Sequence, residues 1–300
     1  MEIETERLKF TELSLLDASR LAEIAEEMAW NDTINVLLKN GNPKSWEGTG
    51  EEELFGYREK VVAYAEKQRG KKLEAFDSDD YKRLYKVIPK SLIPTKNWHI
   101  NYSLMKPDFK LKSLDFVKGA AERRQKSERR GYWLGIRDKA SGRLIGATAI
   151  SAVEIKGKDG VMRVGHSGQF IHPDFQRKGY ISETKAVMAD FMYKYLNDMQ
   201  VAPISENAMF YTTCDRLNEG SQRLQAASGA NCITETLKPG EKLEFYASRE
   251  QIQNSKIARK NVMWRARLDD GKTIFSQTGK ADLKMLYSIN QLNVGRQNGR

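Results

Sequence analysis

The pattern of apolar and polar positions changes its period several times along the first half of the chain. Residues 7–13 alternate apolar and polar side chains, which predicts a strand, and apolar residues then recur at helical spacing after Ser14. Residues 31–115 carry mixed-charge helical stretches near 51–69 and 78–88 and show few strand patterns. A mostly helical insertion is therefore expected there, followed by a further helical stretch over 113–130.

Strand patterns become dense after Gly131. Residues 132–136 and 144–150 flank a Ser-Gly turn, which predicts two antiparallel strands, and a third strand is expected over 162–171. The remaining elements expected are a long helix over about 180–197, a strand over 208–214, a helix over 219–228 and a last strand over 261–267. This order predicts an α+β fold with a mixed, mostly antiparallel sheet flanked by helices.

Composition narrows the class of protein. Of the 300 residues, 40% are hydrophobic and 30% are charged, as in a globular protein with a polar surface. The longest nearly apolar run, residues 144–153, is too short to span a bilayer, and the first residues lack the apolar core of a secretion signal. A cytoplasmic protein with no membrane partner is expected. Two cysteines and three histidines cannot build a closed zinc site, so no metal is expected.

The positive charge is concentrated in the second part of the chain. Residues 131–300 hold 25 basic and 17 acidic side chains, whereas residues 1–130 hold 25 and 23, which together give the net charge of +10. Such a field attracts nucleic acid, an anionic membrane or a polyphosphate cofactor. A solvated basic surface without a specific ligand gives the same pattern.

The most informative motif lies where the strand over 162–171 gives way to the long helix. A short loop with two bases and Gly179 connects them, so unpaired amides at the helix start and the positive end of the helix dipole both favour an anion. The loop lacks the glycines of a Walker loop or of a dinucleotide fingerprint. The sequence therefore indicates a phosphate cradle, with an ordinary strand-to-helix turn as the alternative.

The residues of this loop resemble the GNAT superfamily of N-acetyltransferases. The segment Gln176-Arg177-Lys178-Gly179-Tyr180-Ile181 matches the family loop Gln/Arg-x-x-Gly-x-Gly/Ala except at Ile181, where the family prefers a small residue. The chain is most similar to the Rim-type ribosomal-protein N-terminal acetyltransferases. The further features of that branch are Thr5-Glu6-Arg7-Leu8, Asp17-Ala18, Ile145-Gly146, Asn218-Glu219-Gly220-Ser221, Leu224 and Gly229.

The resemblance implies a GNAT-like domain of residues 1–30 and 131–268, interrupted by a mostly helical insertion over 31–130 and followed by an extension over 269–300. It also implies an enzyme that moves the acetyl group of acetyl-CoA to a primary amine of a protein N-terminus or a small molecule, by direct attack on the thioester. The residues expected to bind the cofactor are Gln169, Phe170, Ile171, Gln176, Arg177, Lys178, Gly179, Tyr180, Ile181, Asn218 and Ser221.

Two residues are candidates for proton transfer. His166 occupies the place where many Rim-type relatives carry a strand glutamate, and an imidazole can relay a proton from the amine. Glu154 and His172 are its rivals, although His172 is expected to face solvent, and no strong base is needed if the amine arrives neutral. Ser221 is placed to protonate the leaving thiolate, with helix capping as the alternative for it and for Asn218.

A binding function without catalysis is the competing hypothesis. A GNAT fold that has lost its activity would bind a protein partner, and the basic segment from Arg259 to Arg267, with Trp264, could grip nucleic acid. A half-buried strand explains the same alternation and makes nucleic acid the less favoured partner. The insertion is expected to shape the choice of acceptor. The aromatic residues expected mostly in its core are Trp46, Phe55, Tyr57, Trp98 and Tyr102.

Overall fold

The strands of the protein form two sheets. The computed structural model describes residues 1–39, 49–99, 112–119, 131–151, 154–156, 162–165, 168–198, 209–215, 218–234 and 242–279. The larger sheet has the order β12-β11-β1-β2-β3-β4-β7 and the smaller has the order β5-β6-β8-β10-β9. The strands of the larger sheet are β1 (Glu2–Glu4), β2 (Leu8–Glu12), β3 (Gly131–Asp138), β4 (Leu144–Ser151), β7 (Gln169–Ile171), β11 (Met263–Arg267) and β12 (Thr273–Gln277). Those of the smaller sheet are β5 (Glu154–Lys156), β6 (Met162–Gly165), β8 (Met209–Cys214), β9 (Asn231–Cys232) and β10 (Leu243–Ala247).

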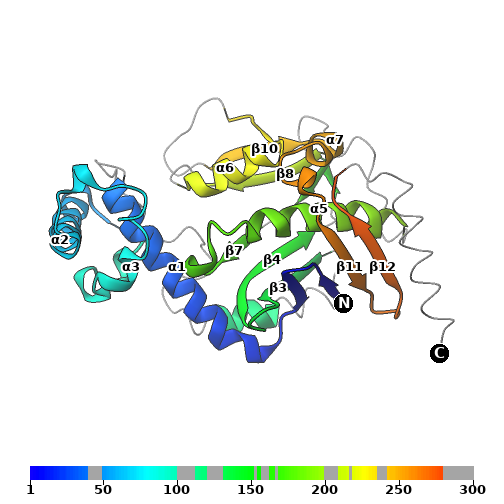
Figure 1. The fold of residues 1–300 in the computed structure, drawn as a ribbon, viewed down its shortest axis with the longest axis horizontal. Coiled ribbons are helices and arrows are strands. Elements are labelled where there is room, and N and C mark those ends of the chain that lie inside the picture. Colours follow the sequence, from blue (N-terminus) through cyan, green and yellow to red (C-terminus); the bar gives the residue numbers. More distant parts are fainter. Residues whose placement is uncertain are drawn as a thin grey trace.

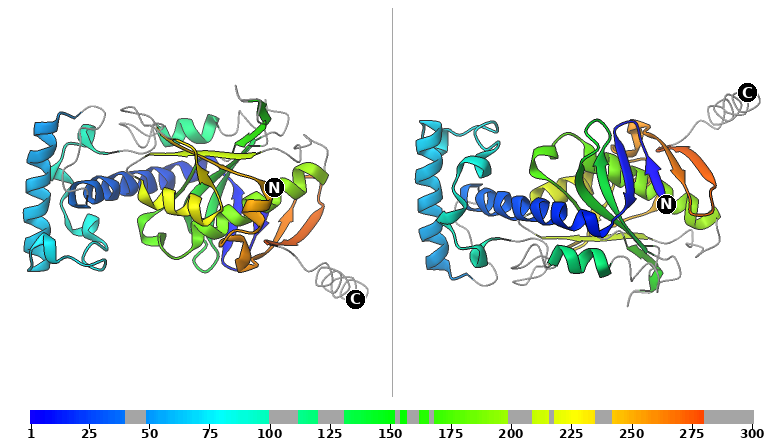
Figure 2. Two further views of the ribbon diagram at one scale, coloured as in Figure 1. Left: turned by 90° about the horizontal axis from the view of Figure 1, so that it is seen from above. Right: turned by 90° about the horizontal axis from the view of Figure 1, so that it is seen from below.

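Helices cover both faces of the larger sheet. The helices among the described residues are α1 (Ala18–Lys39), α2 (Glu51–Arg69), α3 (Leu84–Val87), a helix over 112–119, α5 (Tyr180–Asp198), α6 (Glu219–Ala227) and α7 (Arg249–Gln253). On one face, apolar residues of α5 such as Phe191 pack against Phe10 and Trp264 of the sheet. On the other face, α1 packs against Leu144 and Phe170. Figures 1 and 2 show α1 continuing past the sheet to carry α2 and α3. The predicted α+β class is confirmed.

The length of α1 ties the expected insertion over residues 31–130 to the sheet. Its first half packs on the sheet, and its second half packs on α2 and α3 within the same apolar cluster. The expected boundary at residues 30 and 31 therefore falls inside a helix that both parts share. Trp30 and Trp98 lie with ring centroids 5.0 Å apart at this junction. Tyr57 and Trp98 are buried in the core of the insertion, as predicted, whereas Phe55 is 40% exposed. Trp46 and Tyr102 lie outside the described residues.

The single strand expected over 162–171 is divided between the two sheets. Its first part, β6, pairs in parallel with β8, and its second part, β7, pairs antiparallel with β4. Among the described strands, the β6–β8 pair is the only parallel one. Because the two parts bond to different neighbours, the sheets separate between β7 and β8.

Several other elements differ from the sequence predictions. The helix expected near 78–88 is reduced to the single turn of α3, because the Asp77 carboxylate accepts the amides of Asp79 and Asp80 and holds the preceding chain in turns. The helix expected over 113–130 is present over 112–119, and residues 120–130 lie outside the described part. The strands β1, β5, β9, β10 and β12 were not predicted. No helix among the described residues is long and apolar enough to cross a membrane.

Candidate cofactor site

The candidate site lies at the end of β7, where the larger sheet separates from the smaller sheet. Gln169, Phe170 and Ile171 form β7, the last strand in the order of the larger sheet, and they pair with β4 at Thr148, Ala147 and Gly146. Gly146 permits this contact, because a Cβ there would lie 2.2 Å from the carbonyl oxygen of Phe170. The chain then passes through a single turn, Pro173–Phe175, before the loop and α5. The loop therefore lies where the two sheets separate.

The loop backbone has the conformation of an anion nest. Arg177 has φ +60° and Gly179 has φ +80°, while Lys178 between them does not have a positive φ. Such alternation turns successive N–H groups toward one point. The amide of Glu183 makes the first helical bond, to the carbonyl of Gly179, so the amides before it at the start of α5 have no partner within the helix. Loop and helix together present a set of donors suited to phosphate oxygens.

The connection between β1 and β2 holds this loop from one side. Arg7 donates from Nη1 to the carbonyl oxygen of Lys178 at 3.0 Å and from Nε to the Glu183 carboxylate at 2.8 Å. The Thr5 hydroxyl donates to the same carboxylate. Glu183 is buried in the first turn of α5, where a negative charge is favoured by the helix dipole. Thr5 and Arg7 thus fix both the loop and the helix start.

Cations gather around the loop from separate parts of the chain. A Cβ placed on Gly179 would lie 3.7 Å from Nη2 of Arg7 and 3.8 Å from Nζ of Lys260. Burial lowers the pKa of Lys39, at the end of α1, and the nearby charge of Arg177 lowers it further. The positive charges of Arg7 and Lys260 next to Gly179 favour an anion at the loop. The sequence did not connect Lys39 or Lys260 to the loop, because no motif joins either residue to it.

Residues 180 and 181 close the loop, and Ile181 is the position at which the chain departs from the family pattern. Tyr180 donates from its hydroxyl to Asp138 at 3.2 Å, and the Arg7 guanidinium lies 4.8 Å from its ring centroid. Ile181 packs against the apolar cluster beneath α5. Its side chain is therefore directed into the protein and leaves the loop amides accessible. Gln176 donates from Nε2 to the carbonyl oxygen of Ile171 at 3.3 Å, which closes the loop onto β7.

The expectation that His172 faces solvent is wrong. The side chain is 8% exposed, and its Nδ1 accepts the amide of Asp174 at 3.1 Å. Burial lowers the pKa of His172, and the charge of Arg20 lowers it further, so the imidazole is neutral and carries its proton on Nε2. Its role in the site is to cap the turn before the loop. His166, the other histidine of the prediction, lies outside the described residues.

The second part of the candidate site is the start of α6. Asn218 is its N-cap and accepts the amide of Ser221 at 2.9 Å through Oδ1. Ser221 is therefore not the capping residue, and its side chain lies close enough to Cys214, at the end of β8, to lower the pKa of that thiol in part. Burial raises the pKa of that thiol. Cys214 is buried, whereas Cys232, the other cysteine, is exposed.

A buried lysine lies behind β8. Lys185 on α5 is 6% exposed and donates to Oε1 of Gln225 on α6. Burial lowers its pKa to about 7. A small cavity of about 10 Å³ adjoins it, with space for at most one water molecule. The amine therefore has few polar partners, which makes its protonated form costly.

The basic segment near the C-terminal end does not present a surface for stacking bases. Trp264 is buried and donates from Nε1 to Asp190 at 2.9 Å, while Arg265 pairs with Glu4 on the neighbouring strand. The side chains of β11 alternate between buried and exposed, as in a half-buried strand. Among the described residues, no group of three His, Cys, Asp or Glu side chains could hold a metal ion.

Structure comparison matches the chain to several solved acetyltransferases at low identity. RimJ of Mycobacterium smegmatis, in complex with CoA-disulfide, is 11% identical over 86% of this chain and 92% of its own, with a TM-score of 0.45. The ribosomal-protein-S5-alanine acetyltransferase of Vibrio fischeri is 13% identical over 84% and 98% of the two chains, with a TM-score of 0.42. A GNAT-family acetyltransferase of Bacillus anthracis is 12% identical over 83% and 99%, with a TM-score of 0.39.

Sequence comparison identifies the family. No curated protein matches the chain in sequence. The family model described as the acetyltransferase (GNAT) domain matches residues 72–231, which is more than half of the 300 residues and includes the loop before α5. The chain therefore belongs to the GNAT family of N-acetyltransferases.

Proposed function

We propose that this enzyme transfers the acetyl group of acetyl-CoA to the primary amine of a protein N-terminus or a small molecule. The observation that carries the proposal is the loop of residues 176–180, whose two left-handed residues and adjoining helix start form an anion nest surrounded by cations. In this assignment the cofactor phosphates bind the amides of the loop. The pantetheine arm follows β7 into the gap that opens toward β8.

The reaction needs a path for one proton. The amine nitrogen attacks the thioester carbonyl carbon, the N–C bond forms, and the C–S bond breaks with its electron pair going to sulfur. In the proposal His166 accepts the proton that the amine loses, through water, and Ser221 donates its hydroxyl proton to the thiolate. Solvent then returns a proton from the base to Ser221. Net transfer moves one proton from the amine to the sulfur.

The position of Ser221 supports the acid role. It lies in the first turn of α6, whose amides and dipole favour a developing negative charge. Since Asn218 supplies the cap, the fold does not require the Ser221 hydroxyl for capping.

Thiol release tests the proposed activity. The protein is incubated with acetyl-CoA and a panel of amines and N-terminal peptides across a range of pH, and the acetylated product is identified by mass. We expect turnover with at least one class of amine, and an ascending limb of the pH–rate profile near pH 6 to 7 that is lost in His166→Ala. A limb that survives, or that moves with the basicity of the acceptor, removes His166 from the mechanism. Failure of every amine to release thiol contradicts the function.

Replacing Ser221 by alanine should separate catalysis from stability. We expect kcat to fall by ~10²-fold or more, as for other general acids, with CoA affinity nearly unchanged. The melting temperature should stay close to that of the wild type, because the cap belongs to Asn218. Ser221→Thr, which keeps a hydroxyl, is the matched control and should retain most of the rate. A lowered melting temperature with an unaffected rate would assign Ser221 a structural role.

A further inference from the structure

The insertion contacts the turn that leads into the cofactor loop. Tyr85 of α3 donates from its hydroxyl to Oδ1 of Asp174 at 2.8 Å, and Nζ of Lys86 forms an ion pair with Oδ2 of the same carboxylate. Asp174 lies in the turn Pro173–Phe175, three residues before Arg177. Tyr85 and Asp174 are 89 residues apart in the sequence, so this contact joins a distant segment to the turn just before the anion nest.

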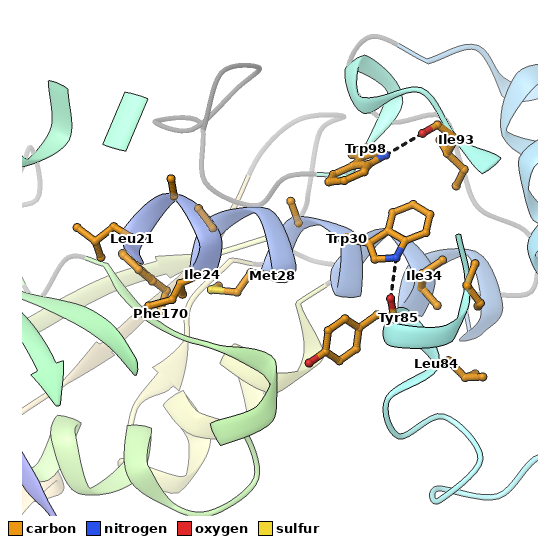
Figure 3. Packing of buried hydrophobic residues seen from close by; sticks show 14 of the residues in the cluster. Leu21, Ile24, Met28, Trp30, Ile34, Leu84, Tyr85, Ile93, Trp98 and Phe170 are labelled. Carbon is orange, nitrogen blue, oxygen red and sulfur yellow. Dashed lines mark hydrogen bonds between the residues drawn. The ribbon is translucent and has the colours of Figure 1, made fainter. Parts of the chain in front are cut away.

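Helix α3 is packed against α1. Leu84 and Tyr85 are buried, and Nε1 of Trp30 donates to the carbonyl oxygen of Tyr85 at 2.9 Å. Figure 3 shows this bond, with the Tyr85 side chain extending back alongside α1 toward the side where Phe170 of β7 lies. The same apolar cluster includes Met28 of α1 and Phe170. The insertion, α1 and the strand before the loop therefore form one packed unit.

At this contact the negatively charged Asp174 faces two hydrogen-bond donors, Tyr85 and Lys86. Burial alone would raise the pKa of Asp174, but hydrogen bonds from Lys86 and Tyr85 more than offset this and hold the pKa below its ordinary value. The carboxylate is therefore ionised at neutral pH. Burial and the nearby carboxylate raise the pKa of Tyr85, so its hydroxyl remains a donor. On the other side of the turn, His172 accepts the amide of Asp174 and donates its own amide to Ile145 at 2.8 Å.

We propose that the insertion positions the cofactor loop, with Tyr85 and Lys86 acting through Asp174 as positioning residues for binding of the CoA phosphates. The inference rests on the proposed function and names the insertion as a determinant of cofactor affinity, in addition to any effect on acceptor choice. Arg7 holds the far side of the loop at Lys178, so the nest is fixed at both ends. Fixing the amides before the ligand arrives removes the cost of ordering them on binding.

The test compares CoA binding by the full chain and by the double variant Tyr85→Phe/Lys86→Met. Because the ion pair is partly exposed, replacing Lys86 alone should have a small effect on CoA binding. The variant therefore removes both donors to Asp174 together. We expect the Kd for CoA to rise about tenfold, the KM for the acceptor to be unchanged, and Lys86→Arg to bind like the wild type. Lys82→Met is the matched control, since Lys82 pairs only locally with Asp79 and lies in the same segment.

The outcomes separate the two proposals. If the wild type does not bind CoA, the proposed function fails. If the wild type binds CoA and the folded double variant binds it equally well, the positioning role is overturned, as it is if only the acceptor KM changes. Should the double variant not fold, Asp174→Asn removes the ion pair while keeping an acceptor for Tyr85, and an unchanged Kd for CoA in that variant also overturns the inference.

Discussion

Gly179→Val should abolish CoA binding by a protein that remains folded. Gly179 has φ +80°, and a Cβ there would point into the space between Arg7 and Lys260. The branched side chain would cover the loop amides and displace the cations that face the phosphates. The left-handed conformation costs a non-glycine residue roughly 1–2 kcal/mol, which a protein of this size tolerates. Calorimetric titration with CoA and a melting curve measure the two effects separately.

Gly271→Val is the matched control for this experiment. Gly271 has φ +83° and no atoms near the position of an added Cβ, and it lies in the turn between β11 and β12. The substitution should therefore cause a similar backbone strain and leave CoA binding as in the wild type. If Gly179→Val binds CoA with wild-type affinity, the cofactor phosphates do not use this loop.

Lys185→Met should stabilise the protein, and the gain should depend on pH. Burial lowers the pKa of Lys185 from 10.5 to about 7 in the folded protein. Below pH 7 the amine is protonated in both the folded and unfolded states, so the full cost of the buried charge is present. Between pH 7 and about 10.4 the unfolded state binds more protons, so wild-type stability rises with pH. At roughly 1.4 kcal/mol per unit of pKa, the effect amounts to a few kcal/mol.

Urea unfolding of the wild type and of Lys185→Met, at about pH 6 and about pH 9.5, measures this effect. The methionine variant should be the more stable at the lower pH, with the difference narrowing as the pH rises. Methionine removes the hydrogen bond to Gln225, which reduces the gain at every pH. Lys242→Met, at an exposed site, should show no such trend. A stability difference that is the same at both pH values would contradict the assignment of a depressed pKa to Lys185.

The local pattern of the sequence predicted the elements that carry the loop. Helix α5 begins at Tyr180 and α6 ends before Gly229, as the periodicity and the glycines indicate. The hairpin of β3 and β4 and the strand β8 also follow from local alternation. These elements are predictable because each has a long apolar stripe or a turn residue that marks its end.

The division of the strand over 162–171 could not be predicted in the same way. Both parts are extended, and what separates them is the identity of the neighbouring strand, which depends on the assembled sheet. The strand β1 was missed because only three residues alternate around the fully buried Ile3. Its contribution to the site is nevertheless large, since the segment after it places Thr5 and Arg7 on Glu183.

The sequence also could not predict which cations lie around the loop. Lys39 lies at the end of a helix whose second half was expected to belong to the insertion, and Lys260 lies in a short turn near the last strands. Arg7 was noted only as part of a family motif, and the structure gives its physical role. Tyr85, Lys86 and Asp174 carry no local pattern, because their contact joins segments far apart in the chain.

Hydrogen exchange of the wild-type protein, with and without saturating CoA, tests the cofactor site most directly. The amides of residues 177–182 should exchange more slowly when CoA is bound, because in our account they donate to its phosphates. The amides of the hairpin formed by β11 and β12 should show no change. Slower exchange confined to other segments, with residues 177–182 unaffected by bound CoA, would contradict the account.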